Sequence, residues 1–81
     1  MPAELDVKPS AALNKAQGDA LAAAAKSLPD GWTVVAEADP ASDQITVRIV
    51  GRNVSTMSRF AARTHPERLA GFLDKVRREH G

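Results

Sequence analysis

The sequence predicts a small α+β domain in which an antiparallel sheet carries two helices packed on one face, in the order α-β-β-β-α. Two runs, over residues 32–39 and 45–50, alternate apolar and polar residues with the period of a strand. The segments on either side carry apolar residues at intervals of three and four, the period of a helix. The chain has 81 residues and no cysteine, which predicts one domain without disulfides.

The first nine residues are expected to form a flexible lead, and residues 10–81 a single small domain. Pro2 and Pro9 interrupt regular structure within the lead. Ser10 then occupies the place of a helix N-cap, just before the first apolar residues of a helical pattern.

The first helix is expected over residues 11–28 and ends before Pro29. Its apolar stripe is narrow and consists mostly of alanine: Leu13, Ala16, Ala20, Ala24 and Leu28, with Leu21 beside them. Gly18 costs about 1 kcal/mol inside a helix. This leaves open a second helix start in which Asp19 is the N-cap.

Residues 32–50 predict two antiparallel strands joined by the turn sequence DPASD. A third strand over residues 54–60 is favoured, because the short GRN sequence before it suits a turn between antiparallel neighbours. In that strand Met57 and Arg59 share one face. A helix over the same residues, with Met57, Phe60 and Ala61 on one side, is the alternative.

The last helix is expected to begin at the THPE sequence, where Thr64 and Glu67 have the spacing of a capping box. Its apolar residues recur at helical intervals and face the sheet. With the strands they make the expected core: Trp32, Val34, Ile45, Val47, Ile49, Phe60, Leu69, Phe72, Leu73 and Val76. Such a core leaves little surplus over chain entropy, and a homodimer would supplement it.

Charge is distributed unevenly along the chain. Residues 1–44 hold three lysines and seven acidic residues, whereas residues 45–81 hold eight basic and three acidic residues. Within the basic part, residues 48–65 contain four arginines and no acidic residue: Arg48, Arg52, Arg59 and Arg63. If a third strand forms, Arg48 and Arg59 point from the sheet face opposite the core, Arg52 lies in the turn and Arg63 at the helix entry. Guanidinium groups placed this way suit phosphate oxygens.

Other polar residues are expected to be structural. Asp39 and Asp43 flank a turn, where aspartate is favoured for bonding to its own backbone. His65 is expected to be a turn residue and His80 lies at the frayed helix end, so the two predict no metal site. No nucleophile motif or glycine-rich phosphate loop is present, and we expect neither catalysis nor a cofactor.

The order α-β-β-β-α is similar to that of double-stranded RNA-binding domains and of HicA-type toxins. The lysine cluster of the former is absent, since RTHPERLAGF stands in its place. The glycine-serine-histidine stretch of the latter is absent too, since DPASD lies between the first two strands. The strand-then-helix end is also broadly similar to the arm-binding domains of tyrosine recombinases. These likenesses assign no family.

Two functions follow as hypotheses. The first is a non-enzymatic module that binds nucleic acid, DNA or RNA, by phosphate contacts from Arg48, Arg52, Arg59 and Arg63. The alternative is a protein-interaction or assembly domain of regulatory or phage type, a homodimer or host-protein binder, which uses the same sheet face or the alanine-rich helix. The N-terminal sequence lacks the features of a signal peptide and no stretch is apolar enough to span a membrane, so a cytoplasmic protein is expected.

Overall fold

The computed structural model describes residues 3–8, 13–39, 41 and 43–80. Four strands and two helices follow one another in the chain: β1 (Glu4–Val7), α1 (Lys15–Ala25), β2 (Thr33–Asp39), β3 (Gln44–Val50), β4 (Ser55–Ala61) and α2 (Pro66–His80). The predicted small α+β class is confirmed. The third strand is also confirmed as β4, and the alternative helix over the same residues is wrong.

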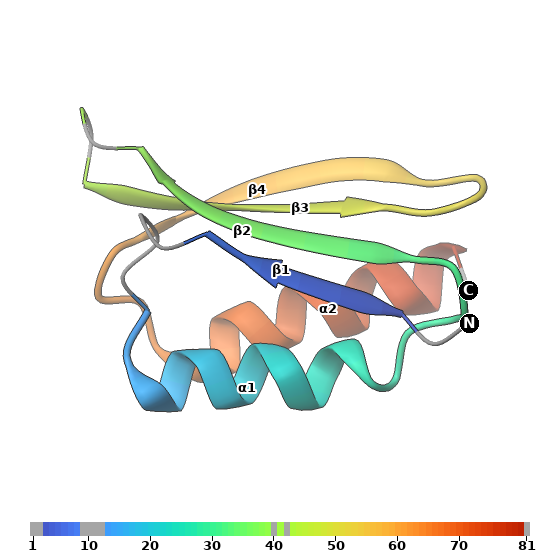
Figure 1. Cartoon of the computed structure of the whole chain (residues 1–81), viewed down its shortest axis with the longest axis horizontal. Helices are drawn as coiled ribbons and strands as arrows, with labels where there is room; N and C mark the ends of the chain where they lie inside the picture. Colours follow the sequence, from blue (N-terminus) through green and yellow to red (C-terminus); the bar gives the residue numbers. More distant parts are fainter. Residues whose placement is uncertain (1–2, 9–12, 40, 42, 81) are drawn as a thin grey trace.

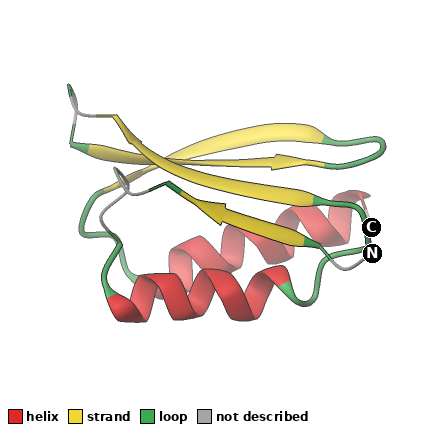
Figure 2. Ribbon diagram, viewed as in Figure 1, coloured by secondary structure: helices red, strands yellow, loops and turns green. Residues whose placement is uncertain are grey.

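The four strands form one mixed sheet in the order β1-β2-β3-β4 (Figure 1). β1 runs parallel to β2, while β2, β3 and β4 are antiparallel neighbours. Both helices lie on the same side of the sheet (Figure 2). The expectation of a wholly antiparallel three-stranded sheet was therefore wrong at one edge, because α1 connects two parallel strands.

The extra strand comes from the segment expected to be a flexible lead. The backbone N–H of Glu4 donates to the carbonyl of Trp32 at 2.9 Å, and that of Lys8 donates to the carbonyl of Ala36 at 2.8 Å. Leu5 lies opposite Val34 and is packed against the core. Residues 3–8 alternate apolar and polar side chains with the period of a strand, but this short run lies between Pro2 and Pro9, which indicate a break in regular structure. Pro2, Pro9 and Ser10 lie outside the described residues.

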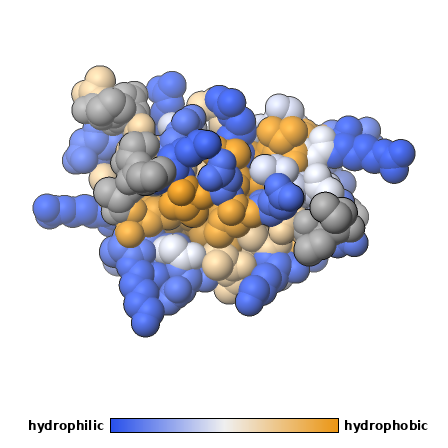
Figure 3. Space-filling view, in the orientation of Figure 1, coloured by the Kyte–Doolittle hydropathy of each residue, from blue (hydrophilic) through white to orange (hydrophobic). Residues whose placement is uncertain are grey.

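The core fills the space between the sheet and the two helices. Eight of the ten residues expected there are buried, and the other two, Phe60 and Phe72, are partly buried. Those two rings meet edge to face with centroids 5.8 Å apart. Five further residues complete the core: Leu21, Ala25, Leu28, Ala36 and Val54. Figure 3 shows hydrophobic residues reaching the surface between the two layers, on the side where β1 lies in front.

The buried face of α1 overlaps the predicted stripe without coinciding with it. Four residues of that stripe are buried or packed against the core: Leu13, Leu21, Ala24 and Leu28. Inside the helix the buried residues are Gln17, Leu21 and Ala25, whereas Ala16 is exposed. The helix is therefore rotated from the expected orientation toward Gln17, by less than the roughly 100° between successive residues. Gly18 lies within the continuous helix, so the alternative start at Asp19 is also wrong.

Gln17 explains the rotation, because its buried side chain makes contacts that hydropathy cannot predict. Asn14 is the N-cap, and a capping box joins it to Gln17: the Gln17 N–H donates to Asn14 Oδ1 at 2.8 Å and the Asn14 N–H donates to Gln17 Oε1 at 3.1 Å. Gln17 Nε2 also donates to the carbonyls of Ala62 at 3.1 Å and Thr64 at 3.0 Å. One amide thus caps α1 and binds the β4–α2 loop to it.

α2 begins one residue later than its sequence suggests. Its first residue is Pro66, which makes His65 the flanking residue and removes Thr64 from the capping position. No hydrogen bond joins Thr64 to Glu67 within the described part of the chain, so the expected capping box does not form. The Thr64 carbonyl instead accepts from Gln17, as above.

We predict that Gln17→Leu lowers the free energy of unfolding by about 2–4 kcal/mol, since it leaves two loop carbonyls without their donor at a site that is 1% exposed. The substitution keeps roughly the side-chain volume, so the loss reports on hydrogen bonding. Chemical denaturation measures it. Lys15→Leu on the exposed side of α1 is the control and should change stability by no more than about 0.5 kcal/mol. Equal stability of Gln17→Leu and the native chain would contradict the role given to this amide.

Candidate functional site

The sheet face opposite the helices, here called the outer face, carries the residues of interest. Side chains that lie directly opposite one another across paired strands point to the same side of a sheet. Val35, Arg48 and Met57 form one such row across β2, β3 and β4. Glu37, Thr46 and Arg59 form the next row. No helix of the structure covers this face (Figure 1).

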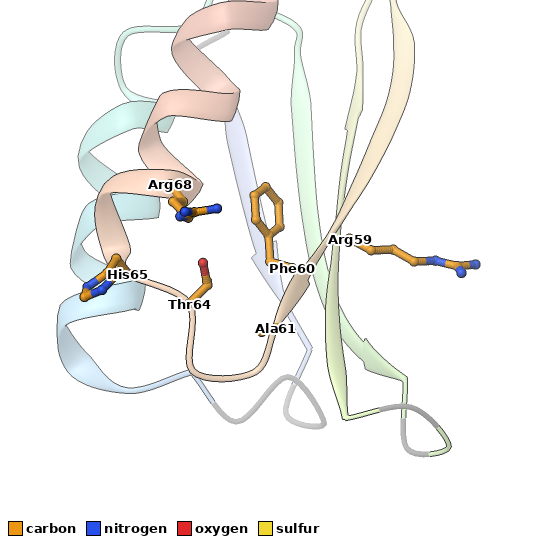
Figure 4. A pocket seen from close by; sticks show the side chains of 6 residues that line it. All are labelled: Arg59, Phe60, Ala61, Thr64, His65 and Arg68. Carbon is orange, nitrogen blue, oxygen red and sulfur yellow. The ribbon is translucent and has the colours of Figure 1, made fainter.

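Arg48 and Arg59 are diagonal neighbours on the outer face. The register places Arg48 opposite Met57 and Arg59 opposite Thr46, which corresponds to a separation of about 7–8 Å between backbones. Both side chains are exposed. Figure 4 shows Arg59 extending from the sheet away from the helices. Within the part of the chain that the structure describes, no carboxylate forms an ion pair with either guanidinium.

Arg52 and Arg63 extend this pair in both directions along the β3–β4 hairpin. Arg52 lies in the turn after β3, and Arg63 follows β4, and both are exposed. The seven residues of β4 between them span about 20 Å. The strands run along the longest dimension of the molecule, 31 Å (Figure 1). We call these four residues the arginine row; each occupies the place expected from the sequence, while the binding role stays a prediction.

Two arginines of α2, Arg77 and Arg78, differ from the arginine row because they are already paired. Arg77 Nη2 lies 2.8 Å from Asp74 Oδ1, and Arg78 Nη2 lies 2.9 Å from Asp74 Oδ2. The hydrogen bond from Arg77, together with the charges of both arginines, holds the pKa of Asp74 below its ordinary value. Both guanidinium groups are paired with the one carboxylate of Asp74 within the same helix, and we assign them no ligand.

The β1–β2 side of the outer face is acidic. The parallel register places Glu4 and Asp6 on the same side of the sheet as Thr33 and Val35, and Glu37 follows on β2. Lys8 Nζ pairs with Asp6 Oδ2 at 2.9 Å, and this hydrogen bond raises the pKa of Lys8. We call the β1–β2 side the acidic half and the β3–β4 side, with Arg48 and Arg59, the basic half. Sequence reasoning missed the acidic half because β1 was not predicted.

The outer face also has apolar residues but no aromatic ring. Val50 and Met57 are exposed to 42% and 45%. Trp32 is buried, as expected for a core anchor, and the two phenylalanines pack on the helix side of the sheet. The face thus offers charge, hydroxyl groups and aliphatic surface, without a platform on which a nucleic-acid base stacks.

A shallow pocket lies where β4 meets the start of α2, lined by Phe60, Ala61, Thr64, His65, Arg68 and Arg59. Figure 4 shows Arg68 on the helix side of the sheet, whereas Arg59 points to the opposite side and His65 points away from Phe60. The cationic side chains therefore do not converge on one point. We assign this pocket no ligand.

Among the described residues, the other polar side chains form no candidate metal site. No group of three or more histidine, cysteine or acidic residues is arranged to hold a metal ion among the described residues. Asp43 adopts a left-handed backbone conformation with φ of 52°, which aspartate tolerates better than most residues, consistent with its expected role as a turn residue. Within the described ranges, neither helix has the length and apolarity required to span a membrane.

Comparison of the chain with protein-family models, with curated proteins and with solved structures finds no match.

The turn that carries Arg52 depends on Gly51. A Cβ atom at Gly51 would lie 2.7 Å from Trp32 Cδ1 and Nε1 and 2.8 Å from Val54 Cγ1. Trp32 is only 5% exposed, so its indole has little room to move. The backbone N–H of Gly51 also donates to the Val54 carbonyl at 2.8 Å. The close approach of the indole therefore requires glycine at this position.

We expect Gly51→Ala to lower the free energy of unfolding by about 1–3 kcal/mol through overpacking against the indole. Thermal denaturation followed by circular dichroism measures the change. Gly71→Ala is the matched control, because a Cβ there meets no atom within 4 Å and alanine favours the helix by up to about 1 kcal/mol. A Gly51→Ala protein as stable as the native chain would show that the turn does not need glycine.

Proposed function

We propose that this chain is a non-enzymatic binding module whose arginine row contacts an extended polyanion, the phosphate backbone of a nucleic acid. One observation carries the proposal: two exposed guanidinium groups lie on a sheet face that no helix covers, and two more lie beyond the ends of the same hairpin. Guanidinium groups form strong paired hydrogen bonds with phosphate oxygens. Within the described ranges these four lack carboxylate partners, so binding would not first have to break ion pairs of the protein.

The length of the arginine row favours a polymer over a small phosphate ligand. Arg52 and Arg63 lie beyond opposite ends of β4, which alone spans about 20 Å. Each strand of duplex DNA places a phosphate about every 3.4 Å along the helix axis, so the row is about as long as six base pairs of duplex. A single small anion could contact only one part of the row.

The chemistry of the face favours backbone contacts to a duplex. Base stacking on aromatic side chains is a main source of affinity for single strands, and the outer face has no aromatic residue. The acidic half repels phosphate, which would restrict the polyanion to the β3–β4 side. We therefore propose contacts to phosphates without base-specific readout.

A protein-binding role for the same face is the second candidate. Val50 and Met57 are large apolar residues that remain 42% and 45% exposed beside the arginines. Burial of these side chains in an interface would be favourable at about 25 cal/mol per Å² of apolar surface. A partner that buries this surface competes for the same residues as the polyanion.

We predict that affinity for a duplex falls about 100-fold when monovalent salt rises from about 50 to 200 mM, as expected for four phosphate contacts. The double variant Arg48→Ala/Arg59→Ala should bind more weakly and show about half the salt slope, because two contacts are lost. Fluorescence anisotropy with a labelled duplex of random sequence measures both quantities, for DNA and for RNA.

The matched control is Lys15→Ala/Lys26→Ala, which removes two exposed charges from α1 on the opposite side of the molecule. Its affinity and salt slope should equal those of the native chain within a factor of about 2. Absence of duplex binding at low salt, or equal losses in the two double variants, would remove the proposal.

We also expect duplex to be bound more tightly than a single strand of equal length and sequence, because the outer face lacks stacking residues. Competition between the two unlabelled forms against one labelled duplex measures the preference. Tighter binding of the single strand would show that another part of the chain, not the arginine row, provides the contacts.

A further inference from the structure

The two halves of the outer face carry opposite charge. Among the side chains that the structure describes, the acidic half holds Glu4, Asp6 and Glu37 against Lys8, a formal charge of −2. The basic half holds Arg48 and Arg59, a formal charge of +2. Apart from the pair between Asp6 and Lys8, no ion pair joins these residues within the described part of the chain. The charges of the two halves are therefore balanced but not paired with each other.

This pattern is self-complementary. A twofold rotation about an axis parallel to the strands, lying above the boundary between β2 and β3, turns a second copy face to face with the first. It places β1 over β4 and β2 over β3 of the other copy, as the strand order requires. The acidic half of each copy then faces the basic half of the other, which satisfies the symmetry of an isologous dimer.

We propose that two copies of this chain associate through their outer faces, with each acidic half covering the other copy's basic half. The apolar side chains beside the arginines, Val50 and Met57, lose contact with water in the same step. When the two sheets pack face to face, each buries the other's outer face, which the helices leave exposed.

The area of the face sets the strength of this association. β2, β3 and β4 have seven residues each, so the face measures roughly 20 by 20 Å, or about 400 Å² per copy. The pair of faces, about 800 Å² in total, lies below the roughly 1,200–2,000 Å² of stable specific interfaces, in the range of weak and transient association. We therefore expect a reversible dimer whose formation depends on protein concentration and weakens with salt.

The dimer and the polyanion would use the same guanidinium groups, so each would exclude the other. Self-association would cover Arg48 and Arg59 of the arginine row at high protein concentration and low nucleic-acid concentration. Added polyanion would convert dimers into bound monomers by mass action. This inference goes beyond the proposed function and does not depend on it, because the charge pattern alone specifies the second copy.

Charge reversal on each half tests the proposal in the full chain. In the glutamate variant, Arg48→Glu/Arg59→Glu, both halves of the outer face are acidic. In the lysine variant, Glu4→Lys/Glu37→Lys, the acidic half becomes basic and the Asp6–Lys8 pair stays in place. Sedimentation velocity over a concentration series, at low salt and without nucleic acid, is expected to show a monomer–dimer equilibrium for the native chain. Each variant alone should remain monomeric, and an equal mixture of the two should form a heterodimer.

Three results would overturn the proposal: a native chain that stays monomeric throughout the series, variants that dimerise as well as the native chain, or a mixture that does not associate. Circular dichroism confirms that each variant is folded. Should one variant fail to fold, the single substitutions Arg59→Glu and Glu37→Lys provide the same test in weaker form. The proposed function is judged separately, at protein concentrations low enough to keep every chain monomeric, where the lysine variant should bind duplex at least as tightly as the native chain.

Discussion

Both helices cover the same face of the sheet, and the rest of the molecule depends on this one-sided packing. Each long strand must divide its residues between an apolar inner side and a solvated outer side, because successive side chains alternate. Val34, Val47 and Ile49 are fully buried on the inner side. The same alternation places Arg48 and Arg59 on the outer side. The core and the charged face are therefore two consequences of one pattern.

The Gln17 amide determines how the helices are positioned relative to the hairpin. Its two donor contacts bind the loop after β4 to the start of α1, while its oxygen completes the cap of that helix. A buried polar group of this kind is costly unless every hydrogen bond is made. Here Oε1 accepts one hydrogen bond and Nε2 donates two, so the amide fixes the position of α1 relative to the loop and the start of α2. Arg63 lies in this anchored loop, between the two residues whose carbonyls accept from Gln17.

The charge pattern of the outer face supports both proposed occupants, a polyanion and a second copy of the chain. Positive charge along β3–β4 suits a polyanion, and the negative charge of β1–β2 limits where such a ligand can lie. The same division of charge suits a second copy of the chain in a twofold arrangement. Because both occupants require Arg48 and Arg59, their competition would make the exposure of the arginine row sensitive to the concentrations of protein and ligand. The paired arginines of α2, Arg77 and Arg78, do not take part in either arrangement.

The α+β class, the hairpin, the strand at β4 and most of the core could be predicted from the sequence, because strand and helix periods are local properties of the chain. The sequence also determined the order of the arginines along the hairpin, since alternation assigns Arg48 and Arg59 to one side. Three features required the tertiary structure. The four residues of β1 become a strand only by pairing with β2, a parallel neighbour brought close by the α1 crossover. The rotation of α1 depends on carbonyls 45 and 47 residues away, which no local pattern contains. The acidic half of the outer face exists only once β1 lies beside β2, because contact between distant segments decides which charges share a surface.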